Sequence, residues 1–342
     1  MRFYCTYFDS GYLTRGLALV ESLRAAGEPF RLFVLCMDTE CARALGALAL
    51  PELTLIPLAD LEAWDPAFAA AKADRSRVEY YYTCSPVLPL YIFQREPQIE
   101  QLVYLDADLY FFASPAPLFH EIGSASVAII AHRFGDELAH LNVFGRFNVG
   151  FLAFRRTPSG LGCLRWWRER TIEWCRAELD GDRYADQKYL DRWPTMVPDL
   201  VEIAHEGANV APWNVGRTPI EQHDGRLFFK GAPLIFYHFH GIKKLAPGIF
   251  QPQLARYFVS PTPSLRTLLY GPYLAALERA EALLRSSGVS NGAGSPGIVA
   301  GLLASGGAAW REELKKLGSS ANAIARGARG RELIYFVAGR AL

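Results

Sequence analysis

The stretch QLVYLDADLYFF, Gln101–Phe112, decides the fold class. Its first five residues are mostly apolar and β-prone, which predicts a buried strand. Asp106 and Asp108 follow the strand, and because alternate side chains point the same way, the two carboxylates project together. In open α/β sheets, ligands bind beyond the carboxyl ends of the strands. The stretch therefore predicts an α/β sheet with a ligand site at Asp106 and Asp108.

Strand-like and helix-like segments alternate on both sides of this stretch. Upstream, Arg2–Tyr7 and Arg31–Met37 predict strands, and the helical spacing of Leu13, Leu17 and Val20 predicts a helix between them. Leu53–Ile56 is a candidate for a short third strand. This alternation predicts a layered α/β domain with a parallel sheet. Downstream strands are expected at Ser126–Ala131, Val149–Arg155 and Leu234–Phe239, with no strand after the last.

Three segments are predicted to be helices. Cys84–Phe93 is expected to begin its helix at Pro86 and Pro89, because proline fits the first turn. Leu164–Ala177 has a loose helical stripe of apolar residues, and Pro272–Arg285 starts with proline and ends with arginine.

Composition limits the class of protein. A length of 342 residues indicates two domains, or one large domain with an appendage. With 51% apolar and 21% charged residues, disorder of the whole chain is excluded, and a net charge of +1 gives no reason to expect a nucleic-acid partner. No apolar run reaches the roughly 20 residues that span a bilayer. MRFYCTYFDSGYL lacks the pattern of a signal peptide, so we expect a cytoplasmic protein whose six cysteines are reduced core thiols.

The end of the chain differs in composition. Residues 286–297, SSGVSNGAGSPG, read as a Gly/Ser linker. From Trp310 onward, seven Lys and Arg stand against three Glu. This basic segment is either a surface that rests on the anionic inner face of a membrane, or a solvated helix or oligomer contact.

The carboxylate pair carries the clearest chemical signal. Two carboxylates so close repel, and the pKa of one rises unless a cation lies between them. Oxygen ligands suit Mg²⁺ or Mn²⁺. The alternative is a solvated, turn-forming pair at a strand end.

A second signal is YHFHGIKK, Tyr237–Lys244. His238 and His240 fall on one strand face, Gly241 permits close approach of a ligand, and Lys243 and Lys244 offer charge to phosphates. Strand histidines are otherwise ordinary hydrogen-bonding residues. Combined with the carboxylates, they form an oxygen and nitrogen set that suits Mn²⁺ better than structural zinc.

The order of these segments resembles that of the GT-A-fold retaining glycosyltransferases, the family 8 group of glycogenin and the lipooligosaccharide galactosyltransferases, in bacterial form. Five blocks carry the resemblance: CTYFDSGYLTRGLALVESL, YLDADLYFF, FNVGFLAFRR, ADQKYLDRW through NVAPWN, and HFHGIK. It implies a Rossmann-like mixed sheet flanked by helices in a catalytic domain, 1–255, followed by a helical extension, 256–342.

The resemblance also implies roles for single residues. Asp106, Asp108 and His238 match the family's ligands for Mn²⁺, and Asp106 also matches its ribose contact. Gly241 and Lys244 match the pattern that faces the diphosphate, with Lys243 as the alternative to Lys244. The remaining matches are Tyr7, Asp9 and Tyr12 at the nucleobase, Asn148 and Gly150 near the donor sugar, Asp186 at its hydroxyls, and Gln187 beside the anomeric carbon. From the residues alone, Asp186 could equally cap a helix, and Asn148 and Gly150 could form a turn.

Two departures from the family stand out. Ser85 occupies the place of a basic residue that contacts the donor sugar or phosphate. Lys244 is followed by Leu-Ala-Pro instead of Pro-Trp, which opens the choice between the two lysines.

The function implied is transfer of a hexose from a UDP-sugar to a glycan, lipid-linked or protein acceptor, as in polysaccharide biosynthesis. An amide at Gln187 is a poor nucleophile, so retention by same-face attack is expected, unlike the two-carboxylate retaining hydrolases. Two alternatives remain: a catalytically silent module that binds a sugar nucleotide or a partner, and an aspartate-nucleophile phosphatase.

Overall fold

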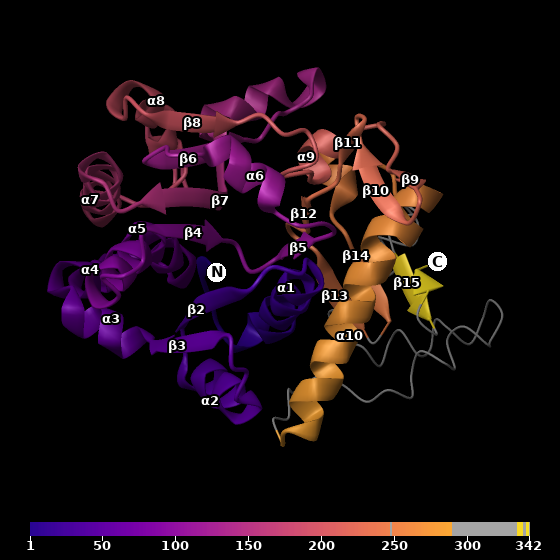
Figure 1. Ribbon diagram of the computed structural model, residues 1–342, viewed down its shortest axis with the longest axis horizontal. Coiled ribbons are helices and arrows are strands. Elements are labelled where there is room, and N and C mark those ends of the chain that lie inside the picture. Colours follow the sequence, from indigo (N-terminus) through magenta and orange to yellow (C-terminus); the bar gives the residue numbers. More distant parts are fainter. Residues whose placement is uncertain (247, 289–333, 338–339, 342) are drawn as a thin grey trace.

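A central sheet of seven strands organises the computed structural model, which describes residues 1–246, 248–288, 334–337 and 340–341. The strand order is β3-β2-β1-β4-β7-β6-β8, and β7 runs antiparallel to both of its neighbours while all other pairs are parallel. The predicted α/β class with a Rossmann-like mixed sheet flanked by helices is therefore confirmed (Figure 1). The strands are β1 (Arg2–Phe8), β2 (Phe30–Cys36), β3 (Leu53–Pro57), β4 (Gln101–Leu105), β6 (Val127–Ala131), β7 (Phe147–Arg155) and β8 (Leu200–Ile203).

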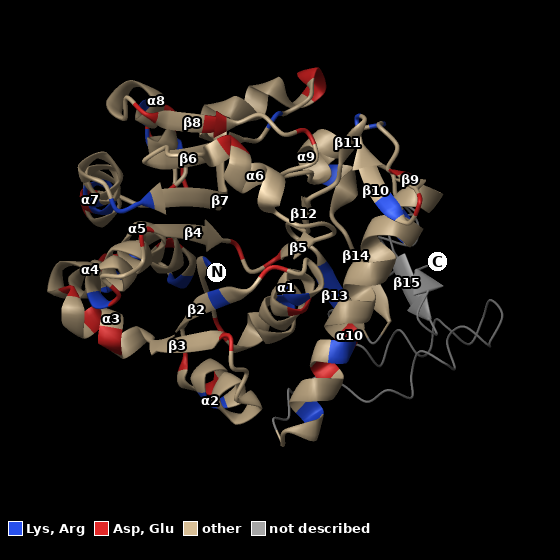
Figure 2. Ribbon diagram, viewed as in Figure 1, with Lys and Arg blue, Asp and Glu red and all other residues tan. Residues whose placement is uncertain are grey.

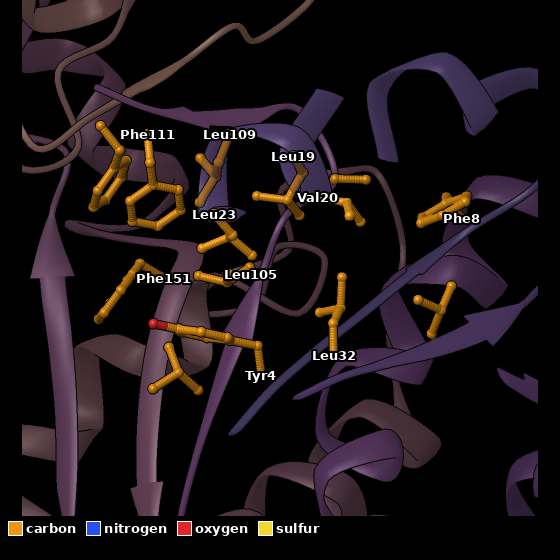
Figure 3. Packing of buried hydrophobic residues seen from close by; sticks show 14 of the residues in the cluster. Tyr4, Phe8, Leu19, Val20, Leu23, Leu32, Leu105, Leu109, Phe111 and Phe151 are labelled. Atoms are coloured by element: carbon orange, nitrogen blue, oxygen red, sulfur yellow. The ribbon is translucent and has the colours of Figure 1, made fainter. Parts of the chain in front are cut away.

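Helices cover both faces of this sheet because its central strands are apolar on both sides. On one face, Tyr4, Leu32 and Leu105 pack against Leu19 and Leu23 (Figure 3). The opposite face is covered through a second apolar cluster that includes Trp167 and Trp193. The first face takes α1 (Leu13–Ala25), α2 (Thr39–Leu48), α6 (Ala116–Ile122) and α10 (Gly271–Ser286); the second takes α3 (Leu58–Trp64), α4 (Pro66–Ala71), α5 (Arg77–Arg95), α7 (Pro158–Glu173) and α8 (Trp193–Met196).

Helix α5 begins earlier than the sequence predicted. A capping box formed by Ser76 and Glu79 starts the helix at Arg77, so Pro86 and Pro89 lie inside it and not at its first turn. The prolines are buried with the apolar segment between them. Packing of this segment thus outweighs the usual preference of proline for helix starts. Helix α7 likewise starts before its predicted range, at Pro158, where the Thr157 hydroxyl accepts from the Gly160 N–H.

Short elements beyond the main sheet position the site. β5 (Leu109–Phe111) pairs antiparallel with β12 (Phe236–His238), which brings residue 238 back beside the end of β4. The expectation that no strand follows Leu234–Phe239 is wrong, because β13 (Lys243–Ala246) and β14 (Ile249–Gln251) form a further hairpin. Further short elements are η1 (Ser10–Tyr12), η2 (Lys72–Asp74), η3 (Asp136–Phe144), η4 (Lys188–Arg192), α9 (Pro212–Val215), β9 (Glu221–His223), β10 (Arg226–Phe229), β11 (Ala232–Pro233), η5 (Leu254–Tyr257), η6 (Leu265–Tyr270), β15 (Ile334–Val337) and β16 (Arg340–Ala341).

The predicted helix Pro272–Arg285 is present as α10, which packs lengthwise on α1 and carries both signs of charge (Figure 2). Arg279 of α10 pairs with Glu21 of α1. Most of the Gly/Ser linker and most of the basic segment from Trp310 lie outside the described residues, so the membrane hypothesis for that segment stays a prediction. The division at residue 255 stays a prediction as well.

All six cysteines are free and buried, as predicted. Burial raises the pKa of the Cys5 and Cys84 thiols well above the ordinary range, so both stay protonated and unreactive. Among the helices of the described segments, none has the length and apolar character needed to cross a membrane.

Gly160 in α7 gives a stability test of the sheet–helix packing. A Cβ at this position would lie 2.2 Å from the Arg155 carbonyl oxygen and 2.8 Å from that of Ser126, both of them backbone atoms. We expect Gly160→Ala to lower the free energy of unfolding by about 1–3 kcal/mol or more. Gly162→Ala, two residues along in the same helix and in open space, should instead raise it by about 0.5–1 kcal/mol. Thermal unfolding of both variants checks this, and equal shifts would contradict the tight packing.

Candidate active site

The carboxylate pair lies in the turn between β4 and β5, as predicted, beyond the carboxyl end of β4. The backbone of Asp106 is held to β7, because its N–H donates to the Gly150 carbonyl at 3.0 Å. One carboxylate oxygen of Asp106 accepts from the Tyr104 hydroxyl at 2.8 Å. The side chain of Asp108 lies 3.0 Å from His238 Nε2. The β5–β12 pairing thus joins two segments about 130 residues apart into one cluster.

Three ligand atoms converge here: those of Asp108, His238 and His240 lie within 4.8 Å of one another. Asp106 borders this set, with Oδ2 3.7 Å from His238 Nε2. Burial raises the pKa of Asp106, whereas the neighbouring His238 offsets the effect of burial at Asp108 and holds its pKa below the ordinary value. Carboxylate oxygens and imidazole nitrogens both bind divalent metal ions, so the residues present fit such an ion. The sequence left open which of the two histidines is a metal ligand, and in the structure both belong to the candidate set.

Aromatic packing fixes the two histidines. The Trp213 ring lies 5.1 Å from that of His238 and 5.6 Å from that of His240. Trp213 comes from the NVAPWN segment, whose Asn214 amide donates to the carbonyls of His132 and Asn209, each at 2.8 Å. The NVAPWN segment therefore supports the candidate metal ligands, because its Trp213 packs against both histidine rings.

Asn148 is held by a partner that sequence reasoning missed. His132 Nδ1 lies 3.2 Å from the Arg146 carbonyl, which can only accept, so we assign the proton of the neutral ring to Nδ1. His132 Nε2 then accepts from the Asn148 amide at 3.4 Å, and Asn148 Oδ1 accepts from the Gly150 N–H at 3.1 Å. The only sequence signal for His132 was its place at the end of a predicted strand.

Asp186 is buried beside a hydroxyl pair. Ser85 Oγ donates to Asp186 Oδ2 at 2.6 Å, and the Tyr7 hydroxyl lies 3.2 Å from the same Oγ. Burial raises the pKa of Asp186 to about 7, although the bond from Ser85 opposes the rise. Gln187 follows, and its amide donates to the Phe144 carbonyl at 3.1 Å. Ser85, which the resemblance aligns with a basic residue, thus donates to the carboxylate that the resemblance implies for the sugar hydroxyls.

Two cavities meet at the cluster and share Tyr7, Tyr82, Asp106, His238 and His240. One cavity, about 470 Å³, contains all three predicted nucleobase residues, Tyr7, Asp9 and Tyr12, and is called the nucleotide-side cavity after that prediction. The other, about 360 Å³, contains Asn148, Asp186 and Gln187, predicted to lie near the donor sugar, and is called the sugar-side cavity for the same reason. A larger cavity of about 740 Å³ lies between α3, α4, α5 and α7 and includes none of the predicted site residues.

Not every predicted residue lines these cavities. Lys244 donates to Glu281 of α10, and Lys243 is exposed. Neither lysine is among the residues that line the two cavities. Gly241 has a left-handed φ of 75°, which glycine adopts without strain, and lies directly after His240. The structure therefore brings the carboxylates, histidines, Asn148, Asp186 and Gln187 together and leaves the two lysines outside.

No family model matches the chain. Among curated proteins, "Uncharacterized protein YfnF" of Bacillus subtilis (strain 168) is 34% identical over 248 residues, which are 70% of this chain and 81% of YfnF. The chain belongs to the family of YfnF. "Uncharacterized protein YfnD" of the same organism is 30% identical over 279 residues, 81% of this chain and 88% of YfnD. Membership of the YfnF family therefore rests on sequence identity over most of each chain.

Solved structures offer similarities of shape. An active-site mutant of LgtC has a TM-score of 0.49 at 16% identity, covering 83% of this chain and 95% of that one. The galactosyltransferase LgtC in complex with donor and acceptor sugar analogs has a TM-score of 0.46 at 16% identity, with the same coverage. Mouse xyloside xylosyltransferase 1 has a TM-score of 0.44 at 17% identity, covering 70% of this chain and 98% of that one. With TM-scores below 0.5, we assign no function from these similarities.

Gly150 in β7 offers a test of the geometry at the cluster. A Cβ here would lie 2.6 Å from Asn148 Oδ1 and 3.0 Å from two atoms of the His238 ring. Gly150→Ala is expected to displace both side chains and to weaken Mn²⁺ binding by about tenfold or more, while the strand remains folded. Paramagnetic resonance of Mn²⁺ measures the affinity, and circular dichroism checks the fold. Unchanged Mn²⁺ affinity would show that His238 is not a ligand in this position.

Proposed function

We propose that this protein is a metal-dependent, retaining GT-A glycosyltransferase that moves a hexose from a UDP-sugar to a glycan, lipid-linked or protein acceptor. One observation carries the proposal. Two cavities, one rich in aromatic residues and one with amide and carboxyl groups, meet at a cluster of two aspartates and two histidines. This arrangement supports a donor whose base, diphosphate and sugar lie in sequence across the cluster.

The donor would lie with its base in the nucleotide-side cavity. There Tyr7, Tyr12 and Tyr81 offer ring faces for stacking, and Asp9 accepts from the Tyr81 hydroxyl at 3.0 Å and pairs with Arg77. In this proposal Asp106, Asp108 and His238, joined by His240, hold Mn²⁺ or Mg²⁺. The ion would neutralise charge on the diphosphate as the sugar leaves.

The sugar would lie beside Asn148, Asp186 and Gln187. A protonated Asp186 can donate to a sugar hydroxyl as well as accept from one, and its burial makes it a binding group rather than a nucleophile. Gln187 is an amide, and we assign it a position beside the anomeric carbon where it stabilises positive charge. Without a carboxylate nucleophile there, attack of the acceptor hydroxyl on the same face accounts for retention.

Aromatic residues also line the sugar-side cavity. They are Phe134, Phe144, Tyr184 and Phe258, whose rings are of the kind that stack on sugars, and we assign them to the acceptor. A cytoplasmic location, with the basic segment at the inner face of a membrane, is part of the proposal.

Release of UDP from a panel of UDP-sugars, with and without Mn²⁺, tests this function. Many transferases slowly hydrolyse their donor, so the acceptor need not be known. Metal-dependent turnover of one donor would support the transferase and name its sugar. Binding of UDP without any turnover would favour a silent binding module, and absence of binding would refute the proposal.

A further inference from the structure

Arg256 lines the sugar-side cavity. Among the described residues that line this cavity, it is the one Lys or Arg. Its guanidinium lies 6.0 Å from the Tyr257 ring, and among the described residues it has no ion-pair partner. Arg77, which lines the nucleotide-side cavity, differs because it is paired with Asp9. An unpaired guanidinium beside a cluster of carboxylates and histidines is free to bind an anion.

Arg256 is carried by η5, a turn that packs against Trp213 of α9. Leu254 anchors the turn in the apolar interior, and the Tyr257 ring lies 6.1 Å from Trp213. Trp213 in turn contacts the rings of His238 and His240. Through Trp213, the position of Arg256 is therefore tied to the position of the metal ligands.

The turn also touches the loop after the histidines. A Cβ on Gly241 would lie 3.6 Å from the Cγ of Gln253, the residue just before η5. Gln253 and Phe258, which bracket η5, have left-handed φ angles of 60° and 58°. Such angles are costly for residues other than glycine and concentrate at functional sites, where packing holds them. Gln253 and Phe258 therefore set the course of the chain on either side of η5.

Two of the other cations near the loop, Lys244 and Arg15, are engaged elsewhere. Lys244 is bound to Glu281, and Arg15 donates to the Ile242 carbonyl at 2.7 Å while stacking on Tyr12. Lys243 is exposed on β13. Neither Arg15 nor either lysine lines the two cavities.

We propose that Arg256 contacts the diphosphate of the sugar-nucleotide donor and stabilises it as the leaving group. The inference rests on the proposed function and names a residue from beyond the segment that resembles known transferases. A guanidinium matches phosphate oxygens with two parallel N–H donors. As the bond between anomeric carbon and phosphate oxygen breaks, its electron pair goes to that oxygen, next to Arg256. The acceptor hydroxyl forms the new C–O bond, and its proton passes to the released diphosphate.

Titration calorimetry with UDP and with uridine, both in Mn²⁺, tests this assignment. In Arg256→Gln, the dissociation constant for UDP should rise about tenfold or more, because a charge-assisted contact is lost. The constant for uridine, which has no phosphates, should stay within about twofold. Arg256→Lys should fall between the two, because it keeps the charge but not the paired donors. Arg226→Gln, at an exposed arginine on β10, serves as the control.

The outcomes separate this inference from the proposed function. UDP affinity that is unchanged in Arg256→Gln, with turnover of the donor intact, overturns the inference and leaves the transferase standing. A larger loss in Lys244→Gln than in Arg256→Gln also overturns it, in favour of the lysine. Equal losses for UDP and uridine would indicate a structural role for Arg256 and overturn it as well. If the wild-type protein binds no UDP, the proposed function fails and the inference fails with it.

Discussion

Asp108→Ala is expected to abolish metal-dependent release of UDP, with a loss of about three orders of magnitude or more. The side chain lies 3.0 Å from His238 Nε2 and belongs to the only candidate metal cluster found in the described part of the chain. Loss of a ligand removes stabilisation of the leaving group, which is worth several kcal/mol, and about 1.4 kcal/mol corresponds to tenfold in rate. Donor hydrolysis measures the rate, and Mn²⁺ paramagnetic resonance measures binding of the ion.

A matched variant controls for the general effect of replacing an aspartate by alanine. Asp60→Ala changes an exposed carboxylate on α3 and should leave rate and metal affinity as in the wild type. Retained Mn²⁺ binding in Asp108→Ala would place the ligands elsewhere. Retained turnover without Mn²⁺ would argue against a metal-dependent reaction altogether.

Asp186→Asn is expected to have opposite effects on activity and on stability. Burial raises the pKa of Asp186 to about 7 from an ordinary value of 3.8, so the folded protein favours the protonated form. The contribution of the neutral Asp186 carboxyl to the free energy of unfolding is fully present below about pH 4. It is lost as the pH rises from about 4 to 7, because only the unfolded chain ionises freely in that window. Asparagine cannot ionise, so the variant should escape this loss.

Thermal unfolding between pH 5 and pH 8 checks the expectation. The difference in free energy of unfolding between variant and wild type should move in favour of the variant as the pH rises, by an amount on the order of a few kcal/mol. At pH 8 donor turnover should fall by about a hundredfold, because the ionised carboxylate accepts hydrogen bonds at both oxygens and an amide has only one acceptor oxygen. Asp182→Asn, at a carboxylate paired with Arg192 on the surface, should bring no gain at pH 8. A variant that follows the wild type at every pH would contradict the raised pKa.

Local pattern was enough to predict the elements that bury apolar side chains. The strand Gln101–Leu105 and the helix Gly271–Ser286 appear close to where spacing and composition put them. Helix α5 was misjudged, since a rule about proline at helix starts was applied where Ser76 and Glu79 had already begun the helix. Strands β13 and β14 were missed because they are short and depend on pairing with other short strands, β14 with both β13 and β15.

The residues of the candidate site also fall into two groups, those that local pattern predicts and those that only the folded structure brings together. Asp106, Asp108 and His238 could be predicted, since strand alternation and the ordered family blocks both point to them. His132 could not, because its role depends on the Arg146 carbonyl and the Asn148 amide across two antiparallel strands. Arg256 was missed for a related reason. An arginine in an irregular segment has no periodicity to mark it, and only the packing of Tyr257 on Trp213 shows where it lies.

The burial of all six native thiols makes this protein a convenient host for a single reporter group. Maleimide reagents require an accessible thiolate, and the native cysteines are all buried, with the pKa of the Cys5 and Cys84 thiols also raised by burial. A cysteine introduced at exposed Ser260, two residues after Phe258, would therefore be labelled alone, without removal of any native cysteine. A fluorophore at Ser260 would report arrival of a nucleotide beside η5 in real time, before any acceptor is known.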